Sequence, residues 1–313
     1  MNKTLLTIFA FSLIFILAFS VSSQAETVLN LSVSASSSST PAFYLQENLS
    51  SPIINTSIHR SRDIVISRLM RGEVDAALLS TNEAAKLFNR DIEVQIAGIH
   101  TWGLFYLITL DSEINDWADL TGKDIYIPDR GGPLDITFQD MLINNNISRD
   151  SDLNVNRGRM REISQLMINN MAETAVLREP FVTQVLIENP QSKIVLDLQS
   201  EWDKIYNSKI PQSALVYRKE FAENNPHLID KINLEYKKAV EEINKQHQTA
   251  ADLAYKYLEI DKEVTLNSLA RLNLDYQKIS EVKVEVKNYF EILMNYNHEA
   301  IGGRMPNEEF YLE

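Results

Sequence analysis

Hydroxyl, amide, imidazole and indole side chains follow two short apolar runs, 76–79 and 94–99. Runs of this length are typical of buried strands. Ser80 and Glu83 have the spacing of a capping box, which predicts a helix start directly after the first run. Open α/β sheets bind ligands at such strand ends, so we expect a binding site there. The candidate side chains are Ser80, Thr81, Asn82, His100 and Trp102.

A serine-rich loop follows the predicted strand 28–34 and leads to Pro41, a residue favoured at the first position of a helix. By composition this loop could be a flexible linker. Its place between a strand and a capped helix favours a hydroxyl-rich binding loop instead. Its candidate ligand contacts are Ser36, Ser37, Ser38, Thr40 and Phe43.

Two glycines and an arginine follow the predicted strand 124–127. Glycine lets the backbone approach a ligand closely at a helix start, and the arginine adds a positive charge. The turn matches neither nucleotide-binding fingerprint, and a plain strand-to-helix turn is the alternative. A second charged pair follows the predicted strand 174–177. The candidates from these two places are Arg130, Gly131, Gly132, Asp135, Arg178 and Glu179.

The first 25 residues have the pattern of a signal peptide. A basic residue precedes an apolar run, and Ser23 and Ala25 precede the expected cleavage before Glu26. A permanent membrane anchor is the alternative. The chain has no cysteine, which excludes a lipid anchor at this point as well as any disulfide. We therefore expect release into the periplasm, or secretion, as a protein that is not a lipoprotein.

The composition excludes several functions. The net charge is −13, which disfavours binding to nucleic acid or anionic lipid. The five histidines lack paired metal-ligand spacing, and there is no G-x-S-x-G nucleophile motif. His100 could act as a general base by position alone, but no partner acid or nucleophile can be named for it. We expect no catalytic residue, no cofactor and no metal.

Strand and helix patterns alternate from 28 to 217, and from Pro226 onward only helical patterns follow. Such alternation favours parallel strands with crossover helices. About nine strands are too many for one sheet of this size, so two lobes are expected. The strands 104–109 and 213–217 would cross between them. The first lobe would comprise 26–109 and 211–313, and the inserted second lobe 110–210.

Five motifs in order resemble those of type 2 periplasmic solute-binding proteins of the nitrate, sulfonate and taurine group. They are GEVDAALLS (72–80), DLTGKDI (119–125), LREPF (177–181), FAENNP (221–226) and IGGRMP (301–306). The resemblance covers the mature chain and implies an α/β fold of two lobes, with mixed sheets flanked by helices, two crossing hinge strands and a helical C-terminal segment. One departure is Arg178, which stands where similar chains often have proline.

The resemblance implies a monomer that binds a small-molecule solute and delivers it to the permease of an ABC transporter. Arg130 and the helix starts favour an anion or zwitterion such as a sulfonate, nitrate or taurine. A binder of a thiamine-type pyrimidine precursor, or of another heteroaromatic, is the alternative, favoured by Trp102, Phe43, Tyr44 and Tyr106. Pyrimidine-forming and menaquinone-pathway enzymes share the fold. The first need a cysteine-rich motif, and the second would not need a signal peptide.

Overall fold

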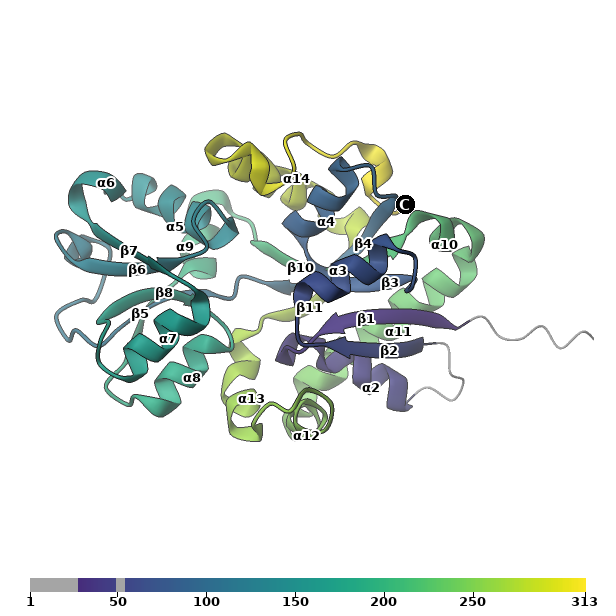
Figure 1. Cartoon of the computed structure of the whole chain (residues 1–313), viewed down its shortest axis with the longest axis horizontal. Coiled ribbons are helices and arrows are strands. Elements are labelled where there is room, and N and C mark those ends of the chain that lie inside the picture. The colour runs from purple at the N-terminus through teal and green to yellow at the C-terminus, as the bar shows by residue number, and fades with distance from the viewer. Residues whose placement is uncertain (1–27, 49–53) are drawn as a thin grey trace, which may run out of the picture.

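The computed structural model describes residues 28–48 and 54–313. The predicted signal peptide, 1–25, lies outside the described residues. The described chain forms two lobes, each with a mixed sheet flanked by helices (Figure 1). This architecture confirms the fold class expected from the sequence. Among the described residues no helix is long and apolar enough to cross a membrane.

The sheet of the first lobe has six strands in the order β11-β4-β10-β3-β1-β2. Strands β1, β2 and β3 are parallel, whereas β10 runs antiparallel between β3 and β4. The all-parallel pattern suggested by strand-helix alternation is therefore interrupted where the chain returns from the second lobe. The strands are β1 (Leu29–Ser34), β2 (Ile54–His59), β3 (Ala76–Ser80), β4 (Val94–Trp102), β10 (Pro211–Arg218) and β11 (Leu274–Lys278).

The sheet of the second lobe has five strands in the order β7-β6-β8-β5-β9. Strand β5, which we expected to belong to the first lobe, pairs with β8 and β9 inside this sheet. The chain crosses between the lobes just before β5, at Gly103 and Leu104, which have φ of 69° and 79°. The strands are β5 (Phe105–Thr109), β6 (Asp124–Pro128), β7 (Asn154–Gly158), β8 (Thr174–Arg178) and β9 (Lys193–Asp197).

Helices cover both sheets, and their apolar faces pack into the cores. Those of the first lobe are α2 (Thr40–Asn48), α3 (Arg62–Met70), α4 (Thr81–Asn89), α10 (Lys219–Asn224), α11 (Pro226–Lys245), α12 (His247–Leu258), α13 (Lys262–Ser268) and α14 (Ile279–Tyr296). Those of the second are α5 (Pro133–Asn144), α6 (Arg149–Asp152), α7 (Met160–Ile168), α8 (Phe181–Glu188) and α9 (Leu198–Tyr206).

The C-terminal part is not wholly helical, because β11 adds an edge strand beside β4. Its five residues, LDYQK, form only a short alternation of buried and more exposed side chains, and the pairing with β4 is irregular. So short a pattern between helices gives little sequence signal. The expectation of a purely helical C-terminal segment was wrong at this point.

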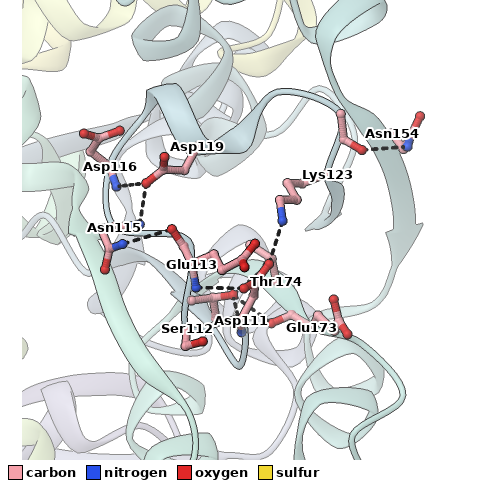
Figure 2. A network of polar contacts seen from close by, with 12 residues as sticks. Asp111, Ser112, Glu113, Asn115, Asp116, Asp119, Lys123, Asn154, Glu173 and Thr174 are labelled. Carbon is pink, nitrogen blue, oxygen red and sulfur yellow. Dashed lines mark hydrogen bonds and ion pairs between the residues drawn. The ribbon is translucent and has the colours of Figure 1, made fainter.

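A network of charged and polar side chains fixes the loop after β5, at the edge of the second sheet away from the first lobe (Figure 2). Lys123 forms an ion pair with Asp111 at 2.7 Å. The carboxylate of Asp119 accepts the backbone N–H groups of Asn115 and Asp116. These contacts hold a turn in place and include none of the candidate binding residues.

Candidate functional site

A cleft of about 600 Å³ lies between the lobes and is lined by residues from both. Its size fits a small molecule, since ligand pockets range from roughly 300 to 1,000 Å³. The first lobe contributes strand ends and the loop between β1 and α2, and the second contributes the ends of β8 and α8. The candidates that meet here are Ser36, Ser38, Ser80, His100, Arg178 and Glu179.

The serine loop provides part of the first-lobe wall. The hydroxyls of Ser36 and Ser38 lie 3.0 Å apart, and both residues face the cleft. The other candidates in this loop do not line it. Thr40 is buried and its hydroxyl donates to the carbonyl of Ser37, while Phe43 stacks on Tyr257 in the core, with ring centroids 4.5 Å apart. Ser37 is also buried.

Arg178 is a half-buried cationic group of the cleft that lacks a partner among the described residues. It ends strand β8, is half-buried, and its guanidinium makes no hydrogen bond or ion pair with any described residue. Burial lowers the pKa of Arg178 to about 10, and the nearby charge of Arg62 adds to this, although Asp129 and Glu83 oppose it. Such a guanidinium is suited to bind an anion that enters the cleft.

Glu179 lines the same cleft, but its carboxylate is already engaged. It lies 2.5 Å from the guanidinium of Arg271 and accepts the backbone N–H and hydroxyl of Thr183. Burial raises the pKa of Glu179 in spite of these partners. Arg271 precedes β11, so this ion pair ties the second lobe to the C-terminal part of the first.

His100 is buried in the cleft wall and is neutral. Its Nδ1 lies 3.5 Å from the hydroxyl of Tyr236, and its Nε2 has no hydrogen-bond partner among the described residues. Burial lowers the pKa of His100 to about 3. Among the described residues no carboxylate bonds to the imidazole of His100 to orient it, so the geometry gives no support to a general base.

The buried imidazole predicts a pH dependence of stability. Its pKa falls from 6.5 in the unfolded chain to about 3 in the folded one, so its contribution is present above pH 6.5 and is lost as pH falls from 6.5 toward 3. Between pH 7 and pH 5 this single group lowers the free energy of unfolding by about 2 kcal/mol. His100→Gln should remove that part of the difference in urea melts at the two pH values. His227→Gln, at an exposed histidine, is the control, and equal slopes for His100→Gln and wild type would contradict the prediction.

Three candidates beside the sheet edge have structural roles. Thr81 donates to the carbonyl of Pro211 at 2.8 Å, and the amide of Asn82 donates to the carbonyl of Ala300. Trp102 is 2% exposed, and its indole N–H donates to the carbonyl of Asp275 at 2.8 Å. Trp102 borders a separate hollow of about 390 Å³ at the crossing between the lobes and does not line the cleft.

The capping box at Ser80 does not form. Its hydroxyl donates to the Glu83 carboxylate at 2.6 Å and makes no bond to the backbone of α4. The charged carboxylate of Glu83 is a stronger hydrogen-bond acceptor than a neutral oxygen, and the hydroxyl of Ser80 donates to it. Ser80 nevertheless stands at the end of β3 and lines the cleft, as its position in the sequence suggested.

The glycine-rich turn before α5 already binds an anionic group, the carboxylate of the protein's own Asp135. The buried carboxylate of Asp135 accepts the backbone N–H of Gly131 at 2.8 Å and pairs with Arg157 and Arg149 at 2.8 and 3.1 Å. It therefore fills the place that a bound anion would take at this helix start. The structure does not bring Arg130, Gly131, Gly132 or Asp135 into the cleft lining, and Arg130 is exposed.

Arginines that the sequence reasoning passed over also line the cleft: Arg60, Arg62 and Arg161. Arg62 begins α3 directly after β2, and Arg161 lies in the first turn of α7 directly after β7. The strands before them, β2 (INTSIH) and β7 (NVNRG), are not continuous apolar runs, so the pattern that located the other strand ends is weak here. Among the described residues no group of three His, Cys, Asp or Glu side chains could hold a metal ion.

No protein-family model and no curated protein matches the chain. Solved structures do. An ABC transporter protein from Parabacteroides distasonis is 23% identical with a TM-score of 0.78, over 92% of this chain and 99% of that one. The periplasmic aliphatic sulphonate-binding protein SsuA from Escherichia coli is 12% identical with a TM-score of 0.72, over 89% and 94%. The periplasmic nitrate-binding protein NrtA from Synechocystis is 11% identical with a TM-score of 0.62, over 88% and 82%. The chain thus has the fold of these binding proteins along nearly its whole length.

Proposed function

We propose that this protein is an extracytoplasmic solute-binding protein, which captures a small anionic or zwitterionic organic solute and delivers it to an ABC transporter permease. The observation that carries the proposal is the cleft of about 600 Å³ between two lobes with the unpartnered guanidinium of Arg178 in its wall. An arginine held partly out of water without a counter-ion gains most from an anionic ligand. SsuA binds an aliphatic sulphonate and NrtA binds nitrate, which are both anions.

Capture would proceed by closure of the lobes about the crossing at Gly103 and Leu104. A solute that contacts both walls binds the closed state better than the open one and shifts the equilibrium toward closure. The predicted signal peptide, with no cysteine at its cleavage site, supports release into the periplasm. The permease would then recognise the closed form.

The other readings receive less support from the site. A heteroaromatic solute would need ring stacking, but the aromatic candidates Phe43, Tyr44, Trp102 and Tyr106 do not line the cleft. Among the described residues the lining contains one phenyl ring, that of Phe181. An enzyme on this fold would need an activated nucleophile or an acid-base pair, and His100 is neutral and lacks a carboxylate partner. The cleft residues therefore favour a protein that binds its solute without transforming it.

A thermal-shift screen tests the proposed function. Methanesulfonate, taurine and nitrate are compared with a neutral hydroxymethylpyrimidine at equal ionic strength. A cognate anion at a hundredfold excess over its Kd stabilises the folded protein by about 2.7 kcal/mol, which raises Tm by several degrees. A shift produced by the pyrimidine alone, or by none of the four compounds, would count against an anion-binding protein of this class.

A further inference from the structure

A second arginine stands on the opposite wall of the cleft from Arg178. Arg62 is the first residue of α3 and belongs to the first lobe, whereas Arg178 ends β8 of the second. Both line the cleft. The side chain of Arg62 is 42% exposed, so its guanidinium is open to a molecule that enters.

The first lobe holds Arg62 in this position through a short chain of polar contacts. Its Nη1 donates to Oε1 of Glu83 at 3.0 Å, and Oε2 of the same carboxylate accepts the hydroxyl of Ser80 at 2.6 Å. A guanidinium has five N–H donors, so this contact leaves several of them for a ligand. Burial lowers the pKa of Arg62, but the carboxylates of Glu83, Asp129 and Asp63 together raise it overall, so the guanidinium stays charged.

The two guanidiniums line the same cleft, and their positive charges interact. The charge of Arg62 is, after burial, the next cause that lowers the pKa of Arg178. Like charges on opposite walls of a narrow cleft repel, and the repulsion grows as the walls approach. Glu83 and Asp129 offset part of it, but Arg178 itself has no carboxylate partner.

We propose that Arg62 is a second anion-binding residue, and that Arg62 and Arg178 clamp one oxyanionic group between the lobes. The inference rests on the proposed function, and it adds a specificity for groups that present at least two oxygens to two forks. Before the anion arrives, repulsion between the two arginines favours separated lobes. The anion removes that repulsion, so binding and closure are coupled through one pair of residues.

The repulsion can be tested without any solute. The chain has no cysteine, so Met171→Cys in the second lobe and Tyr255→Cys in the first, both exposed, give two unique spin-label sites. In low salt, where the screening length is about 30 Å at 0.01 M, Arg62→Gln and Arg178→Gln should each shift the interlobe distance distribution to shorter values than wild type. Arg304→Gln, at an exposed arginine that lies outside the cleft and is paired with Asp91, is the matched control and should not. Distributions of Arg62→Gln and Arg178→Gln that match wild type would overturn the repulsion.

The clamp is tested with sulfate as the probe in calorimetric titrations at constant ionic strength. Arg62→Gln and Arg178→Gln should each weaken sulfate binding, and the double variant should lose at least about fivefold less than the product of the two single losses. Arg62→Lys, which keeps the charge but not the fork, should recover part of the affinity. Three results would overturn the clamp: independent effects of the two substitutions, an Arg62→Gln variant that binds sulfate as tightly as Arg304→Gln, or no sulfate binding by wild type. A failed solute screen with intact sulfate coupling would instead reject only the proposed transport role.

Discussion

Replacement of Arg178 by glutamine should weaken binding of the cognate anion by about 2–5 kcal/mol, which is a factor of about 30 to several thousand in Kd. The reason is that Arg178 is partly withdrawn from water and has no counter-ion among the described residues, so the solute supplies its partner. Stability should not fall with affinity. Removing an unpaired, desolvated charge leaves the free energy of unfolding unchanged or higher.

Titration calorimetry and urea melts on the same protein separate the two effects. Arg60→Gln is the matched control, because Arg60 lines the cleft but is largely exposed and paired with Glu259. An exposed ion pair of this kind contributes about 0–1 kcal/mol, so this variant should bind nearly as wild type does. Equal affinities of Arg178→Gln and wild type would remove the main support for an anionic solute.

Truncation of Trp102 to alanine should act on folding instead of binding. The side chain is 2% exposed and its indole N–H is bonded to the carbonyl of Asp275. Loss of a buried tryptophan costs about 3–5 kcal/mol of stability. Trp102 does not line the cleft, so solute affinity should change by no more than about twofold, as expected for sites that share no contacts.

Urea unfolding of Trp102→Ala, Trp102→Phe and wild type measures this difference. The phenylalanine variant keeps a ring in the core but loses the bond to Asp275, and should therefore lie between the other two. A large loss of solute affinity in Trp102→Ala with little change in the unfolding midpoint would contradict this prediction and show that Trp102 contributes to the binding site.

Strand ends were the productive signal in the sequence. The pattern of a buried strand followed by polar residues singled out Ser80, His100 and Arg178, and all three line one cleft in the structure. This pattern can be read from the sequence because the period of apolar residues and the strand-helix order are local properties. Arg62 and Arg161 also follow strands, but β2 and β7 lack a continuous apolar run and so give a weaker signal. Whether the lobes bring such residues into one cavity is decided by contacts far apart in the chain.

The local sequence pattern did not show which polar groups are already bonded to other residues of the protein. Asp135 follows a glycine-rich turn as a ligand-binding residue would, yet Arg149 and Arg157 approach it from later elements and neutralise it. The indole N–H of Trp102 donates to the carbonyl of Asp275, which lies 173 positions later in the chain. Such partners are set by tertiary packing, which a single sequence does not show.

The place of β10 has a consequence for the order in which the protein is made. This strand lies between β3 and β4, and it follows the whole second lobe in the chain. A growing polypeptide therefore exposes β1 to β4 without their central partner until Pro211–Arg218 has been synthesised, whereas 105–197 supplies every strand of the second sheet in one uninterrupted piece. Because pairings of long sequence separation form late and slowly, the second lobe should be the first to become compact, and the half that begins the chain should be the last to close its core.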